Sequence, residues 1–147
     1  MNVTYSTTMT RLCQLSSRVA KRLSNAHALR QSPEELANTI QKLDQELIVL
    51  KSSLQDIVHL DTPINPSRLV VGISAGQAMS IQSMYYGMVF DIHTPLTYPW
   101  SRGIPSLSQL PNVQSQVEAS SAIVADTSRK AIMASTFVQP DANCSIQ

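Results

Sequence analysis

The chain has 147 residues, of which 43% are hydrophobic and 14% are charged, and its formal net charge is +1 at pH 7. This length is enough for one domain with a modest hydrophobic core, and so few charged residues exclude a solvated, disordered acidic or basic protein. A nearly neutral chain has no overall electrostatic attraction for nucleic acid or for an anionic membrane surface. No apolar run in the sequence approaches the length of a transmembrane helix, so we expect no membrane-spanning segment.

Charged residues are distributed unevenly along the chain. Residues 1–31 contain five basic residues and no acidic one, whereas residues 32–61 contain six acidic residues and two basic ones. A basic segment beside an acidic one predicts an antiparallel pair of helices with complementary faces. The acid-free first segment, which is rich in Ser and Thr, also has the composition of a mitochondrial transit peptide, and this alternative stays open.

The first expected element is an amphipathic helix over residues 6–28. Arg11, Arg18 and Arg22 fall mainly outside its apolar face, and we favour a pairing of this basic face with the acidic second helix over contact with phosphates. Apolar residues recur at the three- and four-residue steps of one helical face. The residues of this face are Met9, Leu12, Cys13, Val19, Ala20 and Leu23.

A second helix is expected to begin at Pro33. Ser32, Pro33 and Glu35 have the pattern of a capping box with proline at the first helical position. We expect the apolar seam of this helix to form part of the core of a helical hairpin, with a dimer zipper as the alternative. The seam alternates steps of four and three residues through Leu36, Ile40, Leu43, Leu47, Leu50 and Leu54.

Residues 57–74 are the expected linker to a third helix, which should run from Ala75 to His93. Pro95 is expected to end this helix at or before Thr94, because proline disfavours a helical conformation of the residue before it. The predicted buried face consists of Ala78, Ile81, Tyr85, Met88 and Ile92, with Met84 and Val89 flanking it.

A loop over residues 94–112, which holds four prolines, leads to a fourth expected helix over residues 113–135. The apolar pattern of this helix is weaker and consists of Val117, Ile123, Val124 and Ile132. The predicted fold class is therefore all-α: a helical hairpin plus two further helices. We expect one helical domain over residues 1–136 and a flexible tail over residues 137–147.

Met84, Tyr85 and Met88 of the third helix are candidates for an apolar pocket or interface. Met84 and Met88 lie close to Tyr85 in the sequence, and unbranched methionine side chains adapt to varied ligands or partners. Plain core packing is the interpretation that we favour for the same residues.

Histidine and cysteine residues are candidates for metal ligands. His27, His59 and His93 show no ligand spacing with each other or with Cys13 and Cys144. We therefore expect solvated or hydrogen-bonded structural histidines, no metal site and no other cofactor in this chain.

The segment Gly72-Ile73-Ser74-Ala75-Gly76 matches the G-x-S-x-G pattern of serine hydrolases. That chemistry needs a sharp strand-to-helix turn within a sheet of several strands, and the sequence offers at most one short apolar run as a strand. His93 is the only histidine after Ser74, and it falls on the third helix. We expect a helix start made of small residues and no enzyme, and a serine hydrolase acting through Ser74 is the third-ranked function.

Three segments in order carry a resemblance to a known family. They are RLCQLSSRVAKRLSNAHALRQSPEELANTIQKLDQELIVLKSSL, MYYGMVFDIHTPLTYPW and VEASSAIVADTSR. They resemble a Leu-rich helix pair, an aromatic helix ending in a His-x-Pro step and an Ala-rich helix of the fungal-specific transcription factor domain. This domain is the regulatory middle region of fungal zinc-binuclear-cluster transcription factors. The resemblance covers roughly residues 9–130, with Thr94 in place of a frequent arginine and Ser120 and Ser121 in place of frequent Cys and Ala-Arg.

The resemblance implies a nuclear role in transcription regulation. The sequence lacks the six-cysteine module that binds zinc and DNA in this family, so zinc and DNA contacts would belong to an absent module. We expect a truncated regulatory domain with exposed apolar surface. Its partner would be another protein or the missing part of the same domain, and a small-molecule effector is possible. The alternative from a different class is a stand-alone helical protein-interaction module.

Overall fold

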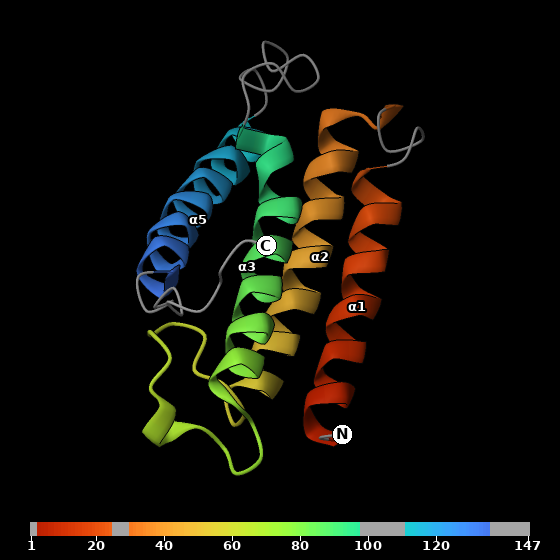
Figure 1. The fold of residues 1–147 in the computed structure, drawn as a ribbon. Coiled ribbons are helices and arrows are strands. Elements are labelled where there is room, and N and C mark those ends of the chain that lie inside the picture. The colour runs from red at the N-terminus through yellow and green to blue at the C-terminus, as the bar shows by residue number, and fades with distance from the viewer. Residues whose placement is uncertain (1–2, 25–29, 98–110, 136–147) are drawn as a thin grey trace, which may run out of the picture.

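A computed structural model of the chain describes residues 3–24, 30–97 and 111–135 (Figure 1). It has an all-α fold, as the sequence predicts, and no strand occurs within these ranges. The helices are α1 (Val3–Leu23), α2 (Pro33–Leu54), α3 (Ala75–Thr97) and α5 (Pro111–Ser135), with a short 3₁₀ turn, η2 (Pro66–Arg68), before α3.

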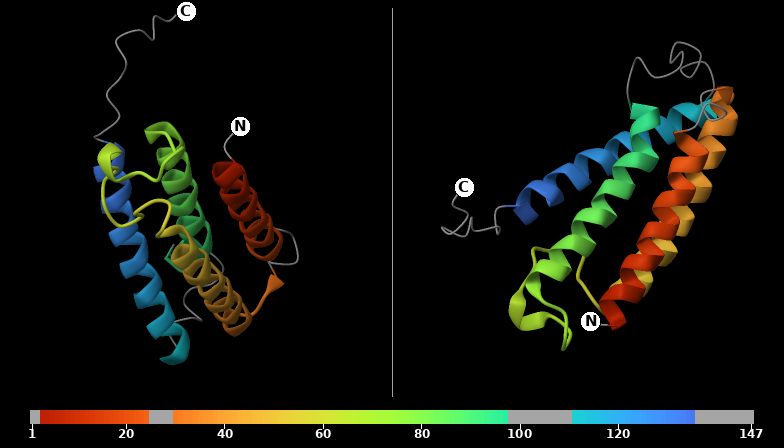
Figure 2. Two further views of the ribbon diagram at one scale, coloured as in Figure 1. Left: turned by 90° about the horizontal axis from the view of Figure 1, so that it is seen from below. Right: turned by 45° about the vertical axis from the view of Figure 1, so that its right-hand side comes forward.

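The four helices run alternately up and down and lie side by side. α1 and α2 form the expected hairpin, α3 packs against both of them, and α5 packs against α3 and α2. As a result, α1 and α5 lie at opposite edges of the molecule, and both views of Figure 2 keep them apart. α2 and α3 therefore form the middle of the fold, and α3 contacts each of the other helices.

Local sequence determines where α2 begins. The Ser32 hydroxyl accepts a hydrogen bond from the Glu35 backbone N–H at 3.2 Å, and the Glu35 carboxylate accepts one from the Ser32 N–H at 2.8 Å. This is the predicted capping box, with Pro33 at the start of the helix, where its missing N–H removes no helical bond.

The predicted pairing of the basic and acidic helices is confirmed. The carboxylate of Glu46 in α2 accepts hydrogen bonds from two arginines of α1. They come from Nε of Arg18 at 2.8 Å and from an Nη atom of Arg22 at 3.1 Å. These side chains are roughly one-third to one-half exposed, so the contacts orient the hairpin and add little stability.

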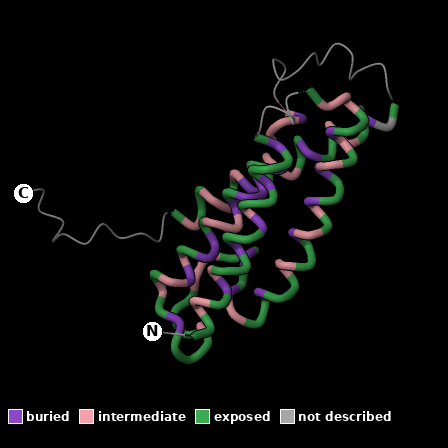
Figure 3. The backbone as a smooth tube through the Cα atoms, turned by 90° about the vertical axis from the view of Figure 1, so that its right-hand side faces the viewer, coloured by how far each residue is buried: buried purple, intermediate pink, exposed green. Residues whose placement is uncertain are grey.

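The core is a continuous apolar cluster between the helices, and its residues recur as purple segments along the tube in Figure 3. In α1 the buried stripe is Leu12, Leu15, Val19 and Leu23, so the sequence-based assignment of Cys13 and Ala20 to that face is wrong: both are exposed. Consecutive helical residues point about 100° apart, and each of these two follows a buried residue directly. The α2 seam is buried as predicted, except that Leu50 is half-buried.

Helix boundaries differ from the predictions at both ends of the chain. α1 starts at Val3, where Tyr5 packs against the core, and it ends at Leu23 instead of continuing to residue 28. α5 starts at Pro111, two residues before the predicted start, and ends at Ser135, as predicted. Its outer end does not follow the predicted apolar face, because Ile132 is 67% exposed.

The prediction that Pro95 ends α3 at or before Thr94 is wrong, because the helix continues to Thr97. A proline in the last turn removes a single backbone donor, and that cost is small beside burial of a large side chain. Leu96, which follows it, is fully buried in the core. Thr97 also donates its hydroxyl to the Thr94 carbonyl at 3.0 Å.

The predicted flexible tail over residues 137–147 lies outside the described residues. So do the predicted boundary at residue 136 and most of the loop expected over residues 94–112. The same holds for His27 and Cys144.

Candidate functional site

The G-x-S-x-G segment forms the start of α3. Gly72 has a φ of 91°, a left-handed conformation that glycine adopts without a steric penalty, and the turn returns Ile73 to the core. The Ser74 hydroxyl accepts the Gln77 backbone N–H at 3.2 Å, while the Gln77 side chain accepts the Ser74 N–H at 3.0 Å. This capping box explains why serine and glutamine stand three residues apart. No histidine hydrogen-bonds to Ser74 in the described part of the chain.

A cavity of about 420 Å³ lies between α2, α3 and α5, and we call it the interhelical cavity. It combines an apolar interior with several ionisable groups. Its wall also includes Asp61, from the linker after α2. The cavity is lined by Asp44, Leu47, Ile48, Lys51, Asp61, Tyr85, Tyr86, Val89, His93, Ala122, Ile123, Asp126, Thr127 and Lys130.

Asp61 connects two helices across the cavity. Its carboxylate accepts a hydrogen bond from Nζ of Lys51 in α2, 2.7 Å away, and another from Nζ of Lys130 in α5, 2.9 Å away. Partial burial alone would raise the pKa of Asp61, but the hydrogen bonds and charges of the two lysines outweigh this effect and lower it. The pKa of Lys130 is raised by hydrogen bonds to Asp126, 2.8 Å away, and to Asp61. Both lysines are therefore paired with carboxylates.

His93 connects the same two helices deeper in the fold. Its ring is fully buried, with Nδ1 3.1 Å from the Ser120 hydroxyl of α5 and Nε2 3.3 Å from the Asp44 carboxylate of α2. With the proton on Nε2, the ring donates to Asp44 and accepts from Ser120, so one neutral tautomer satisfies both contacts. His93 is thus a hydrogen-bonded structural histidine, as predicted, whereas His59 is exposed.

The Asp44, His93 and Ser120 series has the residue types of a serine-hydrolase triad but not its geometry. In such triads Nε2 faces the serine and Nδ1 faces the acid, which is the reverse of the order here. Ser120 also lies within helix α5 and is completely buried, so a substrate carbonyl has no approach to its hydroxyl in this conformation. The arrangement is suited to clamping α2, α3 and α5 together.

Two tyrosines of α3 close the cavity on one side. Tyr85 and Tyr86 meet edge to face, with ring centroids 6.0 Å apart. Tyr86 donates its hydroxyl to the Leu60 carbonyl at 2.6 Å and Gln82 donates to the Thr62 carbonyl at 3.0 Å, so α3 holds the linker in place. Burial, with a smaller effect of the Asp61 charge, raises the pKa of Tyr85 to about 12. Tyr85 therefore presents a neutral phenol to the cavity.

The structure separates the three residues predicted to form an apolar pocket or interface. Tyr85 is half-buried and lines the interhelical cavity. Met88 is buried in the core, and Met84 packs against the core from the side, and neither lines that cavity. The two methionines therefore agree with the favoured interpretation, core packing.

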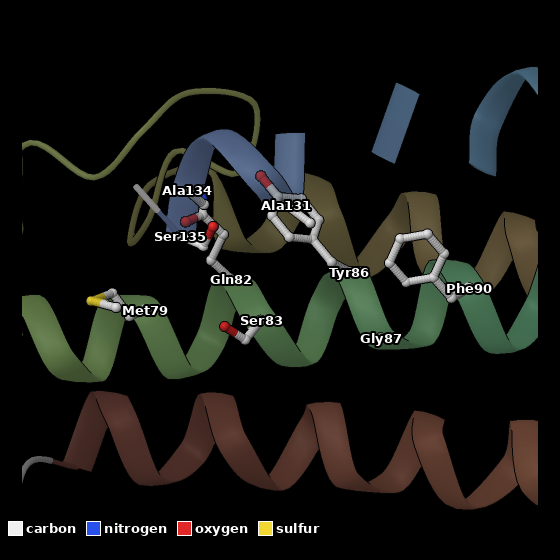
Figure 4. A pocket seen from close by; sticks show the side chains of 9 residues that line it. All are labelled: Met79, Gln82, Ser83, Tyr86, Gly87, Phe90, Ala131, Ala134 and Ser135. Atoms are coloured by element: carbon white, nitrogen blue, oxygen red, sulfur yellow. The ribbon is translucent and has the colours of Figure 1, made fainter. Parts of the chain in front are cut away.

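A second hollow lies between α3 and the C-terminal half of α5, with a volume of about 300 Å³, and we call it the α3–α5 groove (Figure 4). In Figure 4 the rings of Tyr86 and Phe90 rise from α3 toward α5. Gly87 lies between them, and a Cβ atom added there would meet nothing within 4 Å. Among the described residues, those that line the groove carry no charge; they are Met79, Gln82, Ser83, Tyr86, Gly87, Phe90, Ala131, Ala134 and Ser135.

Sequence reasoning missed the polar residues that build the interhelical cavity. Asp44 and Asp61 stood out only as part of an acidic segment, Ser120 stood out only as a departure from the family pattern, and Lys130 carried no signal. These residues come from separate helices and a linker, so the distances between them along the chain follow no regular repeat from which their contact could be predicted.

Comparison of the chain with protein-family models, with curated proteins and with solved structures finds no match in any of the three. Among the described residues, no group of three or more His, Cys, Asp or Glu side chains is placed to hold a metal ion. None of the helices in the described ranges is both long and apolar enough to span a membrane.

Proposed function

We propose that this chain is a non-catalytic helical regulatory domain that acts in transcription control in the nucleus and receives a small-molecule effector in the interhelical cavity. The observation that carries the proposal is the cavity itself. It is bounded by three helices and a linker, so a ligand bound there contacts elements that are distant in sequence. Such a ligand can change how α5 sits against α2 and α3, which is the kind of change that a regulatory domain transmits.

The contacts around the cavity support this role. α5 is tied to α2 through two polar bridges, one at His93 and one at Asp61. A ligand that competes for either bridge has a direct effect on the position of α5. The resemblance to the fungal-specific transcription factor domain supports transcription as the process that is regulated. Zinc and DNA contacts would then belong to another module of that kind of protein.

A stand-alone protein-interaction module is the second candidate, and the α3–α5 groove favours it. The described residues that line the groove carry no charge, and two of them, Ser83 and Gly87, are small enough to allow close approach of a partner. Ile132 and Met133, on the adjoining end of α5, are 67% and 56% exposed. Exposed apolar residues next to an apolar groove are typical of partner-binding surfaces.

A tethering experiment tests the transcription proposal. The chain is fused to an unrelated DNA-binding domain, and expression of a reporter gene is compared with that from the DNA-binding domain alone. We expect a several-fold change in reporter expression. We also expect Ala122→Phe, which fills the cavity, to alter this change, because Ala122 lines the cavity from an exposed position that tolerates a larger side chain.

Ala125→Phe is the matched control, since Ala125 is equally exposed on α5 but does not line the cavity. If the fusion is nuclear and well expressed and leaves the reporter unchanged, the role in transcription is wrong. If Ala122→Phe and Ala125→Phe behave alike, the cavity is not the input site. Concentration-dependent association in sedimentation experiments would instead favour the interaction module.

A further inference from the structure

We infer that the interhelical cavity binds a monocationic amine with an apolar body, held by the carboxylate of Asp44. This inference rests on the proposed function, because it names the chemical class of the effector for the same cavity. Three features support it: the balance of charges on the lining, the vacant hydrogen-bonding capacity of Asp44, and the apolar and aromatic interior.

The charge balance of the cavity favours a cation. Among the described residues, its lining has three carboxylates, Asp44, Asp61 and Asp126, against two ammonium groups, Lys51 and Lys130. Between these two kinds of group there is an excess of one negative charge. A bound monocation would offset this excess, whereas an anion would add to it.

The existing ion pairs leave one carboxylate available. Asp61 already accepts both lysines, and Asp126 accepts Lys130. Asp44 contacts His93 through one oxygen at 3.3 Å, and within the described residues it makes no other hydrogen bond or ion pair. Its side chain is 26% exposed, so a ligand entering the cavity can reach it. A carboxylate accepts several hydrogen bonds, and a protonated amine is a strong donor to it.

The lysines do not make a competing anion site. Each ammonium group already pairs with a carboxylate at 2.7 to 2.9 Å. An anionic ligand at these ammonium groups would compete with Asp61 and Asp126, whose carboxylates already balance their charges. An amine at Asp44 breaks none of these contacts.

The interior of the cavity suits an apolar body next to the amine. Leu47, Val89 and Ile123 line it from three different helices. Tyr85 contributes an aromatic ring, and a cation within about 6 Å of such a ring is attracted to its face. Small hydrophilic cations such as the ammonium ion lack the apolar part and would gain little here.

Three probes of equal chain length test the inference: hexylamine, hexanol and hexanoate, which are cationic, neutral and anionic at pH 7. Binding to the full chain is measured by calorimetric titration and by the NMR signals of the Tyr85 ring and the Ile123 methyl groups. We expect hexylamine to bind and to shift these signals, and hexanol and hexanoate to bind at least about tenfold more weakly.

Two substitutions test whether the carboxylate of Asp44 is the group that binds the amine. Asp44→Asn keeps an acceptor for His93 and removes the negative charge, and we expect it to weaken hexylamine binding roughly tenfold. Asp91→Asn removes an exposed carboxylate of α3 that does not line the cavity, and it should leave binding unchanged. Ala122→Phe should abolish binding of every probe without touching any charged group.

The outcomes separate this inference from the proposed function. Equal loss of hexylamine affinity in Asp44→Asn and Asp91→Asn would overturn the assignment to Asp44. Tighter binding of hexanoate or hexanol would overturn the amine class, but the cavity would still be a ligand site. If no probe shifts the Tyr85 and Ile123 signals, the inference is wrong, and the reporter experiment with Ala122→Phe then decides the proposed function separately.

Discussion

The strongest prediction concerns the buried hydrogen bonds of His93, tested by Ser120→Ala, His93→Leu and the double variant. Ser120→Ala leaves Nδ1 of a fully buried ring without a partner, and an unsatisfied buried polar atom costs about 1–3 kcal/mol. His93→Leu leaves the buried Ser120 hydroxyl unsatisfied at a similar cost. It also removes the contact to the partly exposed Asp44, which is worth about 1 kcal/mol, so we expect a loss of roughly 2–4 kcal/mol.

The double variant distinguishes a true hydrogen-bond partnership from two independent effects. With both polar groups removed, neither is left unsatisfied, so the double variant should be more stable than the sum of the single effects predicts, by about 1–2 kcal/mol. The free energy of unfolding is measured by urea titration followed by far-ultraviolet circular dichroism. His59→Ala, at an exposed histidine, is the control and should change stability by less than about 0.5 kcal/mol. Additive effects, or single variants as stable as the parent, would refute the role of His93 as a clamp.

Three further predictions concern the charged and titratable groups. Asp61 has a lowered pKa, so its contribution to stability is present above about pH 4 and is lost as the pH falls below that value. The free energy of unfolding of Asp61→Asn should therefore fall less than that of the parent when the pH is lowered through this range. The raised pKa of Tyr85, about 12, should appear in an NMR titration of the tyrosine rings and be absent in Tyr85→Phe. The contribution of Tyr85 to stability is fully present below about pH 10, the usual tyrosine pKa, and is lost as the pH rises from there toward about 12. Glu46→Gln should cost less than about 1 kcal/mol at low salt and close to nothing in 1 M salt, because both arginine contacts are exposed, and a larger, salt-independent loss would contradict this.

Local sequence was sufficient to predict the helices and the class of fold. The capping box of Ser32 and Glu35 depends on residues three apart, and the leucine seam of α2 repeats with the helical period. Both signals are read within a few turns of one helix. The pairing of Arg18 and Arg22 with Glu46 was also predictable, because a short connection between two helices places their faces together.

Predictions failed where packing between elements outweighed a local preference. Pro95 favours a helix end, yet burial of Leu96 holds the last turn of α3 in helical form. Cys13 fits a loose three- and four-residue pattern, but the position of α2 and α3 around α1 decides which side of the helix is covered. The spacing of apolar residues predicts which residues share one side of a helix. The neighbouring helices determine which part of that side is buried.

The candidate site was beyond sequence reasoning for the same reason. Asp44, His93 and Ser120 come from three helices, separated by 49 and 27 residues along the chain, and meet only because α5 packs against both α2 and α3. Tyr85 was recognised as important, but its partners were expected to be methionines instead of Asp61 and Lys130. The amphipathic character of the helices could be predicted, because it follows from the spacing of apolar residues along each helix. The set of polar groups that share the cavity could not, because contacts across helices depend on how the helices are placed in space.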